Sequence, residues 1–114
     1  MKNLNVDIFD RVTSVAHKST MVFKHGTVIV KNGEIISEGY NHLADFMCHQ
    51  WSVHSEVDAI LNLKKNHRNK KFLEDAVMIV VRIGAKNDMR MSKPCDACKK
   101  AIEKAGIKRI LYSM

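Results

Sequence analysis

The chain has 114 residues, of which 46% are hydrophobic, and a formal net charge of +7. This length supports one hydrophobic core and excludes a second domain of ordinary size, so we predict a single domain over residues 1–114. The longest apolar stretch, near residues 76–81, is too short to span a bilayer and predicts no membrane contact. Three cysteines cannot all pair within one chain, so free or metal-bound thiols in the reducing cytoplasm are expected.

The positive charge is concentrated in the second half of the chain. Residues 1–63 carry five Lys/Arg and seven Asp/Glu, whereas residues 64–114 carry fourteen and five. The densest basic run covers residues 64–71. It indicates either a surface that steers an anionic substrate, such as a nucleotide or a nucleic acid strand, or a solvated helix end without a ligand.

The first predicted elements are a helix and a hairpin. A helix is expected over residues 6–19, because apolar residues repeat on one helical face: Ile8, Phe9, Val12, Val15 and Ala16. Two β-branched runs follow at residues 27–30 and 34–38, and the Asn32-Gly33 pair between them predicts an antiparallel hairpin. A loop is expected from there to about Trp51.

The second half alternates helices and strands. Apolar residues at helical spacing predict a helix that starts near His54 and ends in the basic run. Residues 75–83 are apolar and β-branched, the pattern of a central strand that is buried on both faces. After a polar loop over 84–93, residues 95–105 predict a helix, and residues 107–112 a last strand, parallel to the central one.

Four side chains in these elements suit a metal site. Cys95 and Cys98 stand at the start of one predicted helix, and His54 and Glu56 stand at the start of another. Two thiolates and an imidazole can fill three of the four tetrahedral positions of zinc and leave the fourth for water, whose protons a nearby carboxylate can move. The unpaired N–H groups of a helix start favour thiolates there. The pattern therefore predicts a zinc hydrolase.

Other interpretations of these residues remain open. A Cys-x-x-Cys pair also occurs in redox proteins, and a closed structural zinc site would need a fourth protein ligand, for which Cys48 or His49 is available. Four histidines stand at no ligand spacing and are interpreted as ordinary loop or surface residues: His25, His42, His49 and His67.

The motifs His54-Ser55-Glu56 and Pro94-Cys95-Asp96-Ala97-Cys98 resemble those of the cytidine and deoxycytidylate deaminase superfamily. The resemblance implies an α/β fold in three layers, α/β/α, with a mixed sheet of four to five strands and an N-terminal antiparallel hairpin. It implies Zn2+ as the cofactor, with His54, Cys95 and Cys98 as ligands. It further implies that Glu56 moves protons while a zinc-bound hydroxide attacks the ring carbon of cytosine and ammonia leaves.

The resemblance also implies substrate contacts and assembly. Asn41 corresponds to an asparagine that the family often places against the sugar, although a simple turn residue is the alternative. The backbone of Ser55, which stands where alanine is usual, would lie near the base carbonyl. The sequence stops directly after the fourth predicted strand, where the family usually adds a further helix and strand. An uncovered sheet edge and, as a result, a homo-oligomer are therefore expected.

Three functions follow. The favoured one is zinc-dependent deamination of a free cytosine nucleoside or nucleotide, whose phosphate would meet basic residues after Lys64. A nucleic-acid-editing deaminase is an alternative, although the basic half offers only Phe72 and Tyr112 as aromatic residues for stacking on bases. The third is a zinc-stabilised binding or structural module without turnover, against which Glu56 argues.

Overall fold

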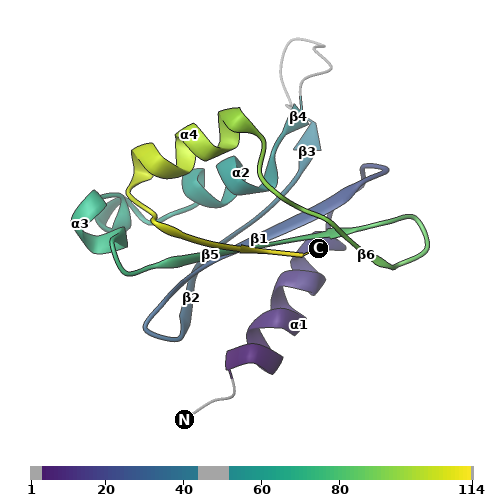
Figure 1. Ribbon diagram of the computed structural model, residues 1–114, viewed down its shortest axis with the longest axis horizontal. Helices are drawn as coiled ribbons and strands as arrows, with labels where there is room; N and C mark the ends of the chain where they lie inside the picture. Colours follow the sequence, from purple (N-terminus) through teal and green to yellow (C-terminus); the bar gives the residue numbers. More distant parts are fainter. Residues whose placement is uncertain (1–3, 44–51, 114) are drawn as a thin grey trace.

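The computed structural model describes residues 4–43 and 52–113 (Figure 1). The elements are, in chain order, α1 (Leu4–Ala16), β1 (Lys24–Lys31), β2 (Glu34–Tyr40), β3 (His42–Leu43), β4 (Ser52–Val53), α2 (Ser55–Leu61), the 3-10 helix η1 (Lys65–His67), α3 (Lys70–Leu73), β5 (Val77–Ile83), β6 (Met89–Arg90), α4 (Asp96–Ala105) and β7 (Arg109–Tyr112). Within the described ranges, no helix is long and apolar enough to cross a membrane.

Strand β5 is the centre of a mixed sheet. One of its sides pairs antiparallel with β1, and the other pairs parallel with β7 and antiparallel with the short strand β6. Strand β1 pairs in turn with β2, which forms one edge of the sheet. The central position of β5 and its parallel pairing with the last strand are thus confirmed. Strand β6 lies in the segment that was expected to be a polar loop, because two exposed residues leave no apolar pattern in the sequence.

The β1–β2 hairpin turns at Asn32 and Gly33. Both residues have positive φ angles, 52° and 78°, and the type I′ turn of a two-residue hairpin needs such angles at both central positions. Asn and Gly adopt them at the lowest cost, so the Asn-Gly pair explains the turn. The predicted hairpin is confirmed, and both strands extend beyond the predicted runs.

Helices cover both faces of the sheet and make three layers. Helix α1 packs on one face, whereas α2 and α4 lie side by side on the other (Figure 1). Successive side chains of β5 alternate between the faces, with Met78 and Val80 in the α2/α4 core and Val81 and Ile83 in the α1 core. The strand is therefore buried on both faces, and the predicted α/β/α sandwich is confirmed.

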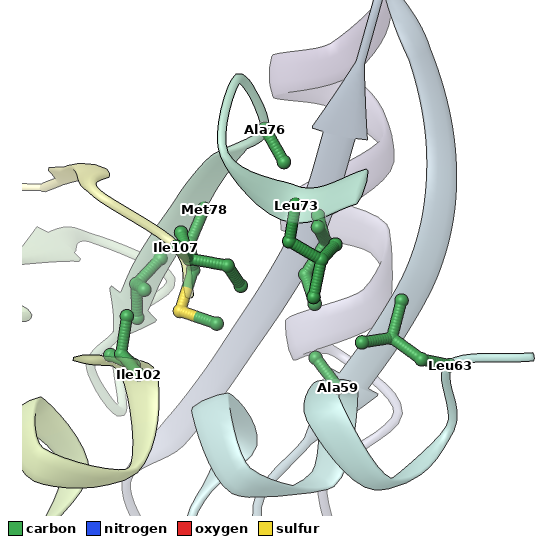
Figure 2. Packing of buried hydrophobic residues seen from close by; sticks show 9 residues of the cluster. Ala59, Leu63, Leu73, Ala76, Met78, Ile102 and Ile107 are labelled. Carbon is green, nitrogen blue, oxygen red and sulfur yellow. The ribbon is translucent and has the colours of Figure 1, made fainter. Parts of the chain in front are cut away.

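The α2/α4 core also orders the basic run. Figure 2 shows Leu73 of α3 above Ala59 of α2, with Met78, Ile102 and Ile107 beside them. The helix that starts near His54 was expected to end within the basic run. Instead, the basic run forms two short helices of its own, η1 over residues 65–67 and α3 over residues 70–73. Helix α3 forms because Leu73 is buried and because the Asn69 side chain accepts a hydrogen bond of 2.7 Å from the Phe72 N–H.

The α1 core corrects one expectation. Ile8, Val12, Val15 and Ala16 are buried as predicted, but Phe9, expected on the same face, is 47% exposed. Helix α1 packs across β1, β2 and β5, and Phe9 lies beside a groove of about 630 Å³ over the β5–β7 side of the sheet, together with Ile79 and Leu111. No described element covers that side, so the apolar arc of the helix is wider than the surface that it packs on.

Two glycines let the helices rest directly on the strands. A Cβ atom on Gly26 would stand 2.5 Å from the backbone nitrogen of Ala16 in α1, and one on Gly39 would stand 2.3 Å from that of Ala59 in α2. Real Cβ atoms do not approach other atoms so closely, so only glycine permits this packing. Gly39 thereby sets the depth of the helix that carries Glu56.

Candidate active site and metal centre

The N-termini of α2 and α4 meet at one end of the helical layer. His54 is the N-cap residue of α2 and Cys95 is the N-cap residue of α4, and neither side chain caps its own helix. Cys98 lies one turn into α4 and is buried. The predicted positions of His54 and Cys95 at the starts of two helices are confirmed.

The three predicted ligands converge. Nδ1 of His54 lies 3.1 Å from Sγ of Cys98 and 3.7 Å from Sγ of Cys95, and one ligand atom from each residue lies within 4.8 Å of the others. With Zn–N bonds of about 2.0 Å and Zn–S bonds of about 2.3 Å, tetrahedral N and S ligands are about 3.6 Å apart. One imidazole and two thiols at these separations are placed to bind zinc, as predicted.

Cys98 needs a cation to become a thiolate. Burial raises the pKa of its thiol, and the neighbouring charge of Glu56 and the contact with Cys95 raise it further. These effects oppose the stabilisation of a thiolate that was expected from the helix start. A bound metal ion supplies the missing positive charge, because a coordinating thiol is deprotonated outright.

Glu56 lies beside this cluster and is only 4% exposed. One of its oxygens, Oε1, accepts a hydrogen bond of 3.0 Å from the hydroxyl of Ser55. That hydroxyl lies 2.8 Å from the hydroxyl of Thr27 in β1, and Thr27 and Ser55 are both fully buried. The carboxylate is therefore tethered to the sheet through two side chains.

His54, Cys95 and Glu56 open onto a cavity of about 560 Å³. Its walls are formed by residues 20–23 between α1 and β1, the segment after β2, the start of α2 and the segment before α4, and include His25, Asn41, Leu43, Ser92 and Lys93. Apolar side chains at the mouth are solvent-exposed, among them Val22 and Phe23. The Arg82 guanidinium lies 4.4 Å from the centre of the Phe23 ring.

His25 is a site residue that the sequence did not reveal. It was interpreted as an ordinary loop histidine, but it belongs to β1, pairs across the sheet with Arg82 and lines the cavity. Burial lowers its pKa, while the charge of Glu56 acts in the opposite direction and those of Arg82 and His54 lower it further. The only signal in the sequence was its position at the start of the first β-branched run.

Asn41 lines the same cavity and braces its wall. Its Oδ1 accepts a hydrogen bond of 2.8 Å from the His25 N–H, and its Nδ2 donates one of 2.6 Å to the Phe23 carbonyl oxygen. A contact of Asn41 with a sugar stays a prediction. Ser55 is fully buried and its side chain points to Thr27 and Glu56, so a contact with the base through its backbone also stays a prediction.

Two histidines that were interpreted as ordinary residues stay outside the cluster, and the two possible fourth ligands are not described. Cys48 and His49 lie outside the described residues. His42 bonds through Nε2 to the Asp58 carboxylate at 3.0 Å, and the His67 ring stacks on Phe72 with 4.4 Å between ring centres.

Fold and site together define a zinc-binding hydrolase with an α/β/α sandwich. The sequence matches, over residues 5–114, the family described as cytidine and deoxycytidylate deaminase zinc-binding region. The chain belongs to this family, whose members are zinc-dependent hydrolases that act on C–N bonds. The predicted enzyme class and the predicted cofactor are thereby confirmed.

Several solved structures share the fold. A dCMP deaminase from the cyanophage S-TIM5, in complex with dCMP and dUMP, has a TM-score of 0.64 and 20% identity, over 98% of this chain and 82% of that one. Guanine deaminase from Bacillus subtilis has a TM-score of 0.64 and 24% identity, over 98% and 64%. Cytidine deaminase from Burkholderia pseudomallei has a TM-score of 0.63 and 17% identity, over 93% and 78%. No curated protein sequence matches the chain.

Proposed function

We propose that this protein is a zinc-dependent hydrolytic deaminase of a cytosine nucleoside or nucleotide. The observation that carries the proposal is the placement of Glu56, His54 and Cys95 at one cavity of about 560 Å³, with the buried third ligand Cys98 next to His54. This volume lies within the range of about 300–1,000 Å³ that is typical of small-molecule sites. A structural zinc site is closed by four protein ligands and requires neither an open cavity nor a buried carboxylate beside it. A zinc-stabilised module without turnover is therefore the weaker alternative.

The residues divide the chemistry between them. His54, Cys95 and Cys98 would hold Zn2+, which supplies the Lewis acidity that activates a water molecule for attack on the ring carbon. Glu56 takes a proton from that water and delivers it to the departing amine, so that one C–N bond breaks, one C–O bond forms and ammonia leaves. The braced wall at Asn41 holds the sugar, and the backbone of Ser55 faces the base carbonyl.

A nucleotide is favoured as the substrate by the charge at the cavity. Lys93 lines the cavity and Arg82 lies beside its mouth, where either can meet a phosphate. The similar dCMP deaminase from the cyanophage S-TIM5 forms a complex with dCMP and dUMP, which supports the same choice. Residues 64–71 do not line the cavity, so their part would be long-range steering rather than contact.

Editing of a nucleic acid is a second candidate, favoured by one observation. Phe23 is 55% exposed at the mouth of the cavity and carries Arg82 over its ring, which makes a stacking surface next to the site. The two aromatic residues of the basic half, Phe72 and Tyr112, do not line this cavity. A single platform of this kind suits one base better than a strand.

The test is ammonia release from a panel of amines by the zinc-loaded protein. The panel holds cytidine, deoxycytidine, their monophosphates, guanine, adenine and a cytosine-containing oligonucleotide. We expect release from the cytosine monophosphates, with a lower KM than for the nucleosides. Release from guanine or adenine alone would contradict the cytosine assignment, release from the oligonucleotide alone would favour editing, and no release from any compound would leave the non-catalytic module.

We also propose that the protein self-associates in the cytoplasm as a single-domain subunit. Strand β7 pairs with β5 along one side, and Leu111 stands 54% exposed over the groove beside Phe9. A second copy would cover this apolar surface. Light scattering should show that Leu111→Glu lowers the molar mass, whereas Leu61→Glu, which is equally exposed at 57% but lies on α2, should not. A monomeric wild-type protein would contradict this proposal.

A further inference from the structure

We propose that Thr27 and Ser55 are positioning residues for Glu56. Together they form a directed chain of two hydrogen bonds that ends on Oε1 of the carboxylate and fixes its orientation. This inference rests on the proposed function, because it takes Glu56 to be the group that moves protons.

The chain is short, buried and continuous. The Thr27 and Ser55 hydroxyl oxygens are 2.8 Å apart, and the Ser55 hydroxyl lies 3.0 Å from Oε1 of Glu56. Thr27 and Ser55 are 0% exposed and Glu56 is 4% exposed. Water therefore has little access to these hydroxyls, and each group depends on the next for its hydrogen bond.

Counting protons fixes the direction of the chain. A serine hydroxyl has one hydrogen, and Ser55 gives it to Oε1 of Glu56. The bond between Thr27 and Ser55 must then use the hydrogen of Thr27, with the Ser55 oxygen as acceptor. Oε1 of Glu56 is therefore the acceptor at the end of the chain, and the chain runs from the sheet to the carboxylate.

The chain is anchored on an interior strand of the sheet. Thr27 belongs to β1 and pairs with Gly39 on one side and Val80 on the other, so its backbone is held by both neighbouring strands. Ser55 begins α2, the helix that Gly39 allows to rest on the sheet. The carboxylate is thus held from the centre of the sheet rather than by a loop, which is what a proton-transferring group needs for precise placement.

Ser55 has a matched counterpart that does not touch Glu56. Ser37 of β2 is also buried, at 7% exposed, and its hydroxyl donates a hydrogen bond of 2.6 Å to the Ala59 carbonyl oxygen of the same helix. Both serines fasten α2 to the sheet, but only Ser55 reaches the carboxylate. Ser37→Ala therefore measures how much stability and kcat change when a buried hydroxyl between α2 and the sheet is removed. The hydrogen bond to Glu56 stays intact in this variant.

The test compares steady-state kinetics of the zinc-loaded variants, with kcat expressed per bound zinc. Loss of a hydrogen bond to a charged group predicts that Ser55→Ala lowers kcat about tenfold while KM changes less than about twofold. Thr27→Val should lower kcat about threefold, Thr27→Ser should restore it, and Ser37→Ala should leave it unchanged. The double variant Thr27→Val/Ser55→Ala should be no slower than Ser55→Ala alone, because the chain is already broken.

A second readout does not depend on turnover. In urea unfolding of the zinc-free protein, Thr27→Val and Ser55→Ala should each lower the urea concentration at the midpoint. The decrease in the double variant should be smaller than the sum of the two, as expected for two residues that share one hydrogen bond. Ser37→Ala combined with Thr27→Val should be additive. Additivity in both pairs would overturn the chain even if the kinetic variants were too unstable to assay.

The controls separate this inference from the function that it assumes. If Glu56→Gln turned over substrate as fast as the wild type, Glu56 would not be the proton-transferring residue, and the proposed function would be contradicted on that point. If Glu56→Gln is inactive but Ser55→Ala and Thr27→Val keep wild-type kcat, or if Ser37→Ala slows turnover as much as Ser55→Ala, the positioning role alone is overturned.

Discussion

The two faces of the sheet use the same strands for different purposes. Strand β1 sends Val28 and Val30 into the α1 core, where the contacts are apolar, and sends Thr27 and Ile29 toward α2. On the α2/α4 face, an apolar core at one end of the layer gives way to a polar end with the metal ligands and Glu56. One alternating strand thus supplies a purely structural face and a face that also carries chemistry.

The largest effect should come from the metal ligands. Cys98→Ser should lower the zinc content from one ion per chain to a small fraction and abolish ammonia release, because the site loses one of its two thiolates. Cys95→Ser should act in the same way. Metal analysis of the purified proteins checks this.

Cys48→Ser is the matched control, since Cys48 is the third cysteine of the sequence. It should keep full zinc and full activity. Zinc retained by both Cys95→Ser and Cys98→Ser would contradict the ligand assignment, and zinc lost from Cys48→Ser would indicate a closed structural site.

A pair of isoleucines separates stability from chemistry. Ile102 of α4 is fully buried on the metal face and Ile8 of α1 is 7% exposed on the other. Each change to alanine should lower the free energy of unfolding by about 2–4 kcal/mol. Only Ile102→Ala should also weaken zinc binding and lower kcat, because it loosens the helix that carries both cysteines.

Urea unfolding and zinc titration with a competing chelator measure the two quantities. Equal losses of zinc affinity in both variants would mean that the site depends on global stability rather than on the local packing of α4.

The smallest effect concerns the ion pair that joins α1 to the sheet. The Arg11 guanidinium bonds to both carboxylate oxygens of Glu38, one of them at 2.6 Å, and the Arg11 side chain holds the pKa of that carboxyl below its usual range. The side chains are 43% and 28% exposed, so solvent screening limits the contribution to about 0.5 kcal/mol.

The pH dependence of this pair has a definite sign. Because the pKa of Glu38 is lower in the folded protein, its contribution is fully present above the unfolded value of about 4.3 and is lost as the pH falls through the folded value. Unfolding at pH 7 and at pH 3 should show that Arg11→Ala destabilises the protein only at the higher pH. A loss that is equal at both values would assign the effect to packing.

The sequence predicted the features that local chemistry determines. Asn32 and Gly33 specify a hairpin turn by their backbone preferences, and His54 and Cys95 were expected at the starts of two helices, where the structure has them as N-cap residues. The apolar, β-branched run of residues 75–83 predicted a strand buried on both faces, and β5 (Val77–Ile83) is that strand. In each case a few neighbouring residues carry the whole signal.

What the sequence did not predict depends on contacts between distant residues. The hydroxyls of Thr27 and Ser55 meet although they are 28 residues apart, and His25 reaches the cavity only because β1 pairs with β5. Helix α3 forms inside the basic run because the side chain of Leu73 packs into the α2/α4 core. Phe9 was expected to be buried and is instead 47% exposed. A helical pattern predicts which side chains share the apolar face of a helix, but not how much of that face the sheet covers.

The most direct test of the account is ammonia release by the zinc-loaded wild-type protein and by Glu56→Gln, measured side by side on deoxycytidine monophosphate. The account predicts release by the wild type and a kcat lower by about 10²–10⁴ in the variant, at unchanged zinc content, because only the proton transfer is removed. Equal rates in the two proteins, or no release by the fully zinc-loaded wild type, would contradict it.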